Sequence, residues 1–141
     1  MEKLSRKMKL SGWGNNKFVN CKVHYPKNIT ELKTLIKNDV IVRGFGRSYG
    51  DSSIQPNLTI ITSKLKKILY FDKKKGIIEV ESGISVKDLI KETISKGWFL
   101  PVTPGSKNIS IGGMVASDVH GKNHHKVGSF RNFITELKML N

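Results

Sequence analysis

The chain has 141 residues and a single cysteine, Cys21, so it is long enough for a modest core and cannot form an internal disulfide. Its formal net charge is +14, but the lysines are spread along the sequence and no aromatic residues interleave with the densest run, at 73–75. Because single-strand binders need stacking aromatics beside a basic groove, nucleic-acid binding is the least favoured alternative. No apolar segment follows the basic N-terminus or approaches the length of a bilayer span, so we expect a cytoplasmic protein without a transmembrane segment.

The first third of the sequence predicts a small α/β unit. Residues 19–24 alternate between apolar and polar types and predict a strand, with Cys21 in a half-buried position. Thr30 is the expected N-cap of a short helix that continues to about Asn38. Residues 40–43 predict a buried strand that leads into a glycine-rich loop. Ligands of α/β units commonly bind beyond the C-terminal ends of strands, so this loop is a candidate site.

The rest of the chain predicts a β-rich region with flanking helices. Three further strands are expected, the last two joined by a hairpin turn: residues 58–62, 68–71 and 77–81. Ser85 is expected to cap a helix whose stop signal is Gly97. For Trp98 and Phe99 we expect core packing in preference to stacking on a ligand. Residues 133–140 resemble a strand whose partner strand does not follow in the sequence.

Residues 42–51 carry the most informative local pattern. Three glycines and two hydroxyl-bearing side chains follow an apolar strand-like run. Glycine allows close approach to the main chain, and successive backbone N–H groups can form a nest for an anion such as a phosphate. The alternative is a plain tight turn between two strands. Arg43 and Arg47 have a second interpretation, as structural ion-pair partners of Asp51 or Asp118.

Residues 104–125 form a second candidate segment, a long loop around a short helix of small residues. Such a helix lets a flat or bulky ligand lie against the backbone, and loops rich in polar groups are more often functional than merely connecting. His120, His124 and His125 near its end also raise the possibility of a metal site. Gly121–Asn123 interrupts a regular helix there, and no cysteine or carboxylate cluster completes a tetrahedral set, so we predict no metal.

Four stretches together resemble one known family. They are SGWG at 11–14, RGFGRSYGD at 43–51, PGSKNISIGGMVASDVHGKNHH at 104–125 and GSF at 128–130. The second and third are similar to the two FAD-contacting segments of PCMH-type flavoproteins, the vanillyl-alcohol oxidase superfamily, and SGWG resembles the N-terminal signature of that family. Within the superfamily, the resemblance is to the decaprenylphosphoryl-β-D-ribose 2′-oxidase-like proteins. The resemblance implies an α+β fold: a PCMH-type FAD-binding domain with a small α/β subdomain followed by a β-rich subdomain with flanking helices.

The resemblance also implies roles for individual residues. The first segment would wrap the FAD pyrophosphate with backbone N–H groups as the main donors, and the second would line the dinucleotide and reach the flavin. The residues expected to contact FAD are Val42, Arg43, Gly44, Phe45, Gly46, Arg47, Ser48, Tyr49, Gly50, Asp51, Ser52, Gly105, Ser110, Ile111, Gly112, Gly113, Ser117, Asp118, Val119 and His120. His120 and Lys122 would border the substrate side of the flavin and are the candidate catalytic residues. In covalent members a histidine tethered to the flavin stands at the position of Arg47, so Arg47 implies non-covalent FAD.

The implied function is that of the FAD-binding portion of a flavin-dependent oxidoreductase, which oxidises a sugar-type or other alcohol by hydride transfer to flavin N5. The substrate would be a small-molecule alcohol or a phosphorylated, lipid-linked sugar. Residues 1–141 correspond to the N-terminal portion of the flavin domain, which is thus incomplete at its C-terminus and lacks the substrate-binding domain and the principal base. We therefore expect a fragment, or one chain of a split enzyme, that is inactive alone. The alternative is a stand-alone FAD- or nucleotide-binding module without catalysis.

Overall fold

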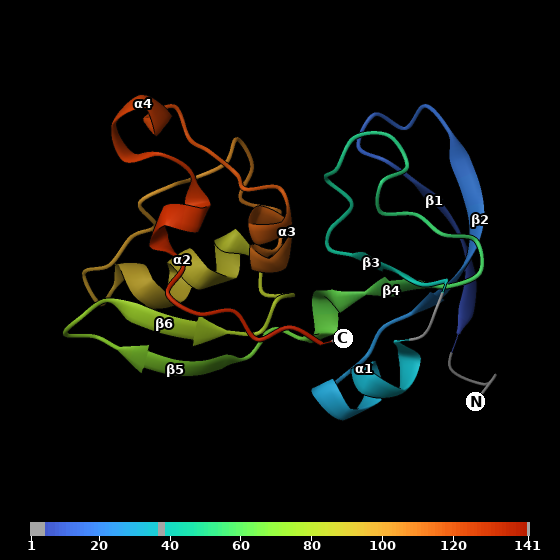
Figure 1. Ribbon diagram of the computed structural model, residues 1–141, viewed down its shortest axis with the longest axis horizontal. Coiled ribbons are helices and arrows are strands. Elements are labelled where there is room, and N and C mark those ends of the chain that lie inside the picture. The colour runs from blue at the N-terminus through green and yellow to red at the C-terminus, as the bar shows by residue number, and fades with distance from the viewer. Residues whose placement is uncertain (1–4, 37–38, 141) are drawn as a thin grey trace. The chain divides into compact units, whose positions relative to one another are not determined.

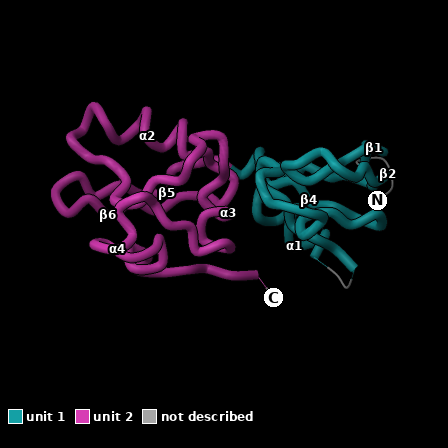
Figure 2. The backbone as a smooth tube through the Cα atoms, turned by 90° about the horizontal axis from the view of Figure 1, so that it is seen from above, with its two compact units in different colours: residues 1–65 teal, residues 66–141 magenta. Residues whose placement is uncertain are grey.

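The computed structural model describes residues 5–36 and 39–140, which are divided between two compact units, residues 1–65 and 66–141 (Figure 1, Figure 2). The strands are β1 (Arg6–Ser11), β2 (Phe18–His24), β3 (Ile41–Arg43), β4 (Thr59–Ile61), β5 (Ile68–Asp72) and β6 (Ile77–Val80). The helices are α1 (Ile29–Leu35), α2 (Val86–Ile94), α3 (Ile111–Ala116) and α4 (His124–Val127), with 3-10 turns η2 (Thr62–Lys64) and η3 (Phe130–Phe133). Both units mix strands and helices, so the α+β prediction is confirmed. Every helix in the described ranges is too short or too polar to traverse a bilayer.

The first unit is built on a four-stranded sheet in the order β1-β2-β4-β3. β1 and β2 are antiparallel, whereas β4 runs parallel to both β2 and β3. Alternation along β1 and β2 turns Leu10, Cys21 and Val23 inward, where they form a core with Ile61 of β4. Cys21 is buried more deeply than expected, and β1 was not predicted. The strand β3 was expected to be buried, but its middle residue, Val42, is exposed.

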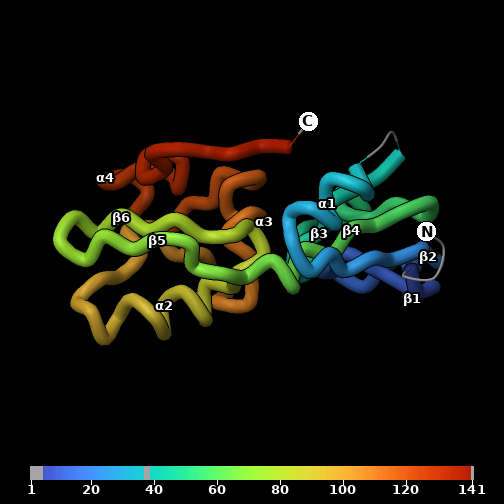
Figure 3. Tube along the Cα trace, turned by 90° about the horizontal axis from the view of Figure 1, so that it is seen from below, coloured from blue at the N-terminus to red at the C-terminus, as the bar shows by residue number. Residues whose placement is uncertain are grey.

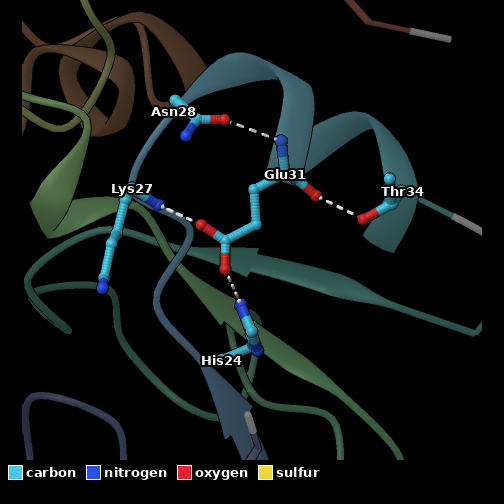
Figure 4. Close-up of polar contacts among 5 residues, drawn as sticks. All are labelled: His24, Lys27, Asn28, Glu31 and Thr34. Atoms are coloured by element: carbon cyan, nitrogen blue, oxygen red, sulfur yellow. Dashed lines mark hydrogen bonds and ion pairs between the residues drawn. The ribbon is translucent and has the colours of Figure 1, made fainter. Parts of the chain in front are cut away.

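The helix α1 begins two residues earlier than the sequence suggested. Asn28 is the N-cap, and its side chain accepts a hydrogen bond of 2.9 Å from the N–H of Glu31 (Figure 4). The Glu31 carboxylate in turn accepts a bond of 2.7 Å from the N–H of Lys27 and lies 2.8 Å from His24 Nε2. The prediction of Thr30 as N-cap was wrong. The acidic residue that helps to cap the helix is Glu31, which lies three residues after Asn28, and its carboxylate bonds the N–H of the residue before the cap. The helix ends at Leu35, and the predicted end at Asn38 lies outside the described residues.

The second unit joins the β5–β6 hairpin to α2 and α3 (Figure 3). The hairpin and its turn were predicted. Ser85 caps α2 as expected, with its hydroxyl accepting a bond of 3.0 Å from the N–H of Asp88. Gly97 also ends the helix as predicted, because its N–H bonds Ile94 O while the N–H of Trp98 bonds Thr93 O. The core of this unit combines residues of α2, α3, η3 and the connecting loops: Ile84, Val86, Leu89, Val102, Ile111, Met114 and Phe130.

Two predictions for the second unit were wrong. Trp98 and Phe99 are 36% and 57% exposed, so they do not pack in the core. Trp98 instead lies against Gly76 in the hairpin turn and donates its indole N–H to Lys73 O at 2.7 Å. The run at 133–140 begins in η3 and continues as a segment without a ladder partner among the described residues. That segment is connected to β6 by an ion pair of 2.7 Å between Lys138 and Glu79.

Candidate functional site

The glycine-rich loop that follows β3 has unused hydrogen-bond donors. From Phe45 to Ser52, none of the backbone N–H groups donates to another described residue. The loop is built around Gly46, which has φ of +68° and lies on the guanidinium of Arg43, so that an added Cβ would fall 2.2 Å from Nη2. Only glycine fits both the left-handed backbone and that contact. The loop therefore exposes main-chain donors on a fixed support, as an anion nest requires.

Arg43 is part of that support. Its side chain is buried, with 8% exposed, and it donates to Ser11 O at 2.6 Å and to Ser53 Oγ at 3.0 Å. Burial lowers the pKa of the Arg43 guanidinium from its ordinary value. Both ends of its fork are thus engaged inside the unit. Its side chain holds the loop, so Arg43 is one of the residues predicted to contact FAD whose side-chain donors already have partners within the protein.

The segment 11–14 packs directly on the loop. The N–H of Trp13 donates to Ser48 O at 3.0 Å. Gly12 approaches Gly50 so closely that an added Cβ would lie 1.9 Å from the Gly50 carbonyl oxygen. The guanidinium of Arg47 lies over the indole of Trp13, with 4.5 Å between Cζ and the ring centroid. Residues 11–14, which the sequence analysis identified only by resemblance, therefore support the conformation of the glycine loop.

Most of the predicted contact residues of the first unit are at the surface. Tyr49 is 80% exposed, and the other exposed members are Val42, Phe45, Arg47, Gly50, Asp51 and Ser52. Gly44 and Ser48 are half-buried, and Ser48 Oγ lies 2.9 Å from Ser53 Oγ. Sequence reasoning did not select Ser53, which bonds both Ser48 and Arg43. The position of Ser53, directly after the residues predicted to contact FAD, was the one sequence feature that could have drawn attention to it.

The second predicted segment, in the other unit, is organised differently. Ser110 caps α3, and its hydroxyl accepts a bond of 3.1 Å from the N–H of Gly113. The N–H groups of Ile111 and Gly112 donate to Ile84 O and Ser82 O at 2.9 and 2.8 Å. The first N–H groups of α3 are consequently in use. This segment offers a ligand its small residues and open backbone, including exposed Gly105, where an added Cβ would meet nothing within 4 Å.

The end of the second segment is fixed by Asp118. Its carboxylate accepts hydrogen bonds from Ser129 Oγ at 2.9 Å and from the N–H of Arg131 at 3.1 Å. These two bonds, together with the nearby Arg131 guanidinium, lower the pKa of Asp118. Val119 lies next to it, and its carbonyl accepts the N–H of Phe130. The backbone from 117 to 120 is thereby tied to 129–131, and His120 forms an isolated bridge with Ser129.

The two candidate catalytic side chains, His120 and Lys122, are both exposed. The His120 ring stacks edge-on with His124, 4.9 Å between centroids, and both Nδ1 atoms lie near Gly121 O, at 3.4 and 3.1 Å. Within the described ranges, no three histidine, cysteine or acidic side chains converge to hold a metal ion.

The arginines do not form the ion pairs that were considered as an alternative. Asp118 pairs with Arg131 at 3.3 Å. For Arg43 and Arg47 the structure shows no carboxylate partner among the described residues, Asp51 included. The free N–H groups of the loop and the unneutralised charge of Arg47 fit an anionic group such as the pyrophosphate of a dinucleotide.

Comparison with known proteins shows the family to which the chain belongs. The FAD binding domain family matches residues 22–141. The chain is 38% identical over 102 residues to decaprenylphosphoryl-beta-D-ribose oxidase of Mycolicibacterium smegmatis, a match that covers 72% of this chain and 22% of that protein. It is 30% identical over 91 residues to D-lactate dehydrogenase of Anaerostipes hadrus, covering 64% of this chain and 19% of that protein.

Among solved structures, alkyldihydroxyacetonephosphate synthase has a similar fold, with a TM-score of 0.68 at 21% identity. This likeness covers 81% of the chain and 24% of the synthase, and it concerns the fold alone. The chain thus spans less than a quarter of the length of each of these relatives. Because the family match takes in most of the chain and both glycine-rich segments, the chain belongs to the FAD binding domain family of PCMH-type flavoproteins.

Proposed function

We propose that this chain binds FAD non-covalently as the cofactor-binding part of a flavin-dependent oxidoreductase. The observation that carries the proposal is the row of unused backbone N–H groups from Phe45 to Ser52, beside the unneutralised guanidinium of Arg47. In this proposal they bind the pyrophosphate of FAD, and the small residues around α3 line the rest of the dinucleotide. Non-covalent binding is supported by Arg47 itself, because a guanidinium cannot form the histidyl tether of covalent family members.

We propose further that the substrate is a sugar-type or other small-molecule alcohol, or a phosphorylated or lipid-linked sugar. When bound, FAD would supply a hydride acceptor, flavin N5, for the carbon that carries the hydroxyl. His120 and Lys122 are exposed and follow Asp118, whose carboxylate is bonded to Ser129. In this proposal their side chains orient the alcohol. The remaining parts of such an enzyme, a substrate-binding domain and the principal base included, are then supplied by residues beyond these 141. The 22% coverage of the mycobacterial oxidase supports that division.

A flavin titration of the purified chain tests the proposal. We expect FAD to bind at least about ten-fold tighter than riboflavin, which lacks the pyrophosphate and the adenosine, in isothermal titration calorimetry. Arg47→Gln should reduce this difference, with the backbone N–H groups retaining part of it, whereas Arg6→Gln, an exposed change on β1, should leave it intact. After acid precipitation the flavin should be in the supernatant. Equal affinity for FAD and riboflavin would contradict the pyrophosphate site, and flavin that stays in the pellet would contradict non-covalent binding.

A further inference from the structure

The pairing of Trp13 with Arg47 has no role in the core of the first unit. Trp13 is 49% exposed and Arg47 is also exposed, with the guanidinium 4.5 Å from the centroid of the indole ring. The indole is placed by the main chain, because the N–H of Trp13 donates to Ser48 O and Gly12 lies against Gly50. The aromatic platform is thus attached to the same loop that carries the arginine, at two positions shortly after Arg47.

An arginine held in this way differs from one held by a carboxylate. The aromatic face restricts the guanidinium without neutralising it, and the in-plane N–H donors stay free. Arg47 has no ion-pair partner among the described residues, and its side chain donates no hydrogen bond to any of them. Its neighbour Arg43 shows the opposite arrangement, since both of its donor ends are used. The charge of Arg47 therefore remains available at the surface of the loop, next to the unused backbone N–H groups.

We propose that Trp13 is a positioning residue for the dinucleotide. It holds the Arg47 guanidinium in the orientation in which Arg47 donates to the pyrophosphate. This inference rests on the proposed FAD site and adds a residue that lies before the matched family segment, which begins at residue 22. In physical terms, the indole removes rotamer freedom that a free arginine would otherwise lose on binding, and such preorganisation strengthens binding without a new contact to the ligand.

A double-mutant cycle separates this role from simple support of the loop. FAD affinity is measured by calorimetry for the unaltered chain, Trp13→Leu, Arg47→Gln and the double variant. We expect Trp13→Leu to weaken FAD about three-fold and Trp13→Phe to restore most of that loss, because the aromatic face is retained. In the Arg47→Gln background, Trp13→Leu should have no further effect. Equal losses in both backgrounds would show that Trp13 only supports the loop and would overturn the proposal.

A second readout keeps the inference separate from the proposed function. In a Trp98→Phe background Trp13 is the remaining tryptophan, since the chain has two. Inorganic pyrophosphate should then change Trp13 emission, and Arg47→Gln should abolish the change. If FAD fails to bind while pyrophosphate gives this response, the proposed function is wrong and the Trp13–Arg47 role stands. If pyrophosphate leaves the emission unchanged, the positioning role is wrong, whatever FAD does.

Discussion

The guanidinium of Arg43 donates a hydrogen bond of 2.6 Å to the carbonyl oxygen of Ser11, which lies 32 positions earlier in the sequence. This bond connects the end of β1 to the end of β3, where the glycine loop begins. The same guanidinium lies against Gly46 and donates a hydrogen bond to Ser53, just after the glycine motif. The glycine loop thus owes its conformation to a buried charge and to a segment outside the glycine motif itself.

Arg43→Lys should destabilise the first unit while leaving its net charge unchanged. A lysine ammonium is a point donor and cannot reach Ser11 O and Ser53 Oγ together as the planar fork does. We expect the free energy of unfolding to fall by on the order of 2 kcal/mol, the scale of a lost hydrogen bond to a charged group. Urea unfolding followed by Trp13 emission in a Trp98→Phe background measures it. Arg6→Lys is the control, and an equal loss there would show that the effect is not due to the fork.

Gly12→Ala should displace the loop. The added methyl would fall 1.9 Å from Gly50 O, a main-chain atom that cannot rotate away. We expect a loss of about 1–3 kcal/mol in the free energy of unfolding, as for other overpacked positions, together with weaker FAD binding. The matched control is Gly14→Ala, whose nearest neighbour is the side-chain oxygen of Asn16 at 3.3 Å. If both variants bind FAD like the unaltered chain, the close approach of Gly12 has no part in the site.

The Glu31 network should make the first unit sensitive to acid. The N–H of Lys27 and the ring of His24 lower the pKa of Glu31 from 4.5 (Figure 4). A carboxylate with a lower pKa in the folded state stabilises the fold above its unfolded value, and the contribution is lost as pH falls through the folded pKa. Glu31→Gln should therefore be less stable at neutral pH and should lose less stability than the unaltered chain on acidification below 4.5.

The measurement is the urea midpoint of the first unit from neutral pH to below 4.5. Glu92→Gln, in α2 of the second unit, is the control for an acidic residue outside the network, because Glu92 forms an exposed pair of 3.5 Å with Lys96. Such pairs contribute little, so its profile should match that of the unaltered chain. Parallel acid profiles for Glu31→Gln and the unaltered chain would rule out this network as the source of the pH dependence.

Lys122→Gln should lower the midpoint reduction potential of bound FAD. The prediction follows from the proposed place of Lys122 beside the flavin, where a positive charge favours the reduced, more negative cofactor. Lys126, in α4, is equally exposed and serves as the matched control. The potential is measured by dye equilibration of the FAD-loaded chain. A change of the same size in Lys126→Gln would mean that only the overall charge is sensed and that Lys122 does not border the flavin.

The sequence was most informative where local rules act alone. The β5–β6 hairpin and the α2 caps follow from alternation, a glycine turn and a serine N-cap, and all of these were predicted. The motifs also identified the family, because the glycine loop is one unbroken stretch of sequence and the α3 segment is another. Thr30 was predicted as the N-cap of α1 where the structure has Asn28, because a polar residue before an apolar run is a degenerate signal.

The remaining features depend on contacts between distant segments. β1 alternates lysine with methionine and leucine, and its strand character comes from pairing with β2. Nothing near Arg43 in the sequence shows that Ser11 accepts its hydrogen bond. Trp98 was expected in the core, but the hairpin turn gives it a surface position over Gly76. Ile111 and Gly112 were expected to contact FAD, and only the fold shows that their N–H groups donate to Ile84 O and Ser82 O.

The most direct test of the central claim is hydrogen–deuterium exchange of the purified chain with and without FAD. The claim is that one FAD molecule contacts both glycine-rich segments. We predict that FAD slows exchange in residues 45–52, whose N–H groups donate to none of the residues that the structure describes, and also in the loop at 103–109 that precedes α3. Protection confined to one of these segments, or found in neither while FAD is bound, would contradict the account.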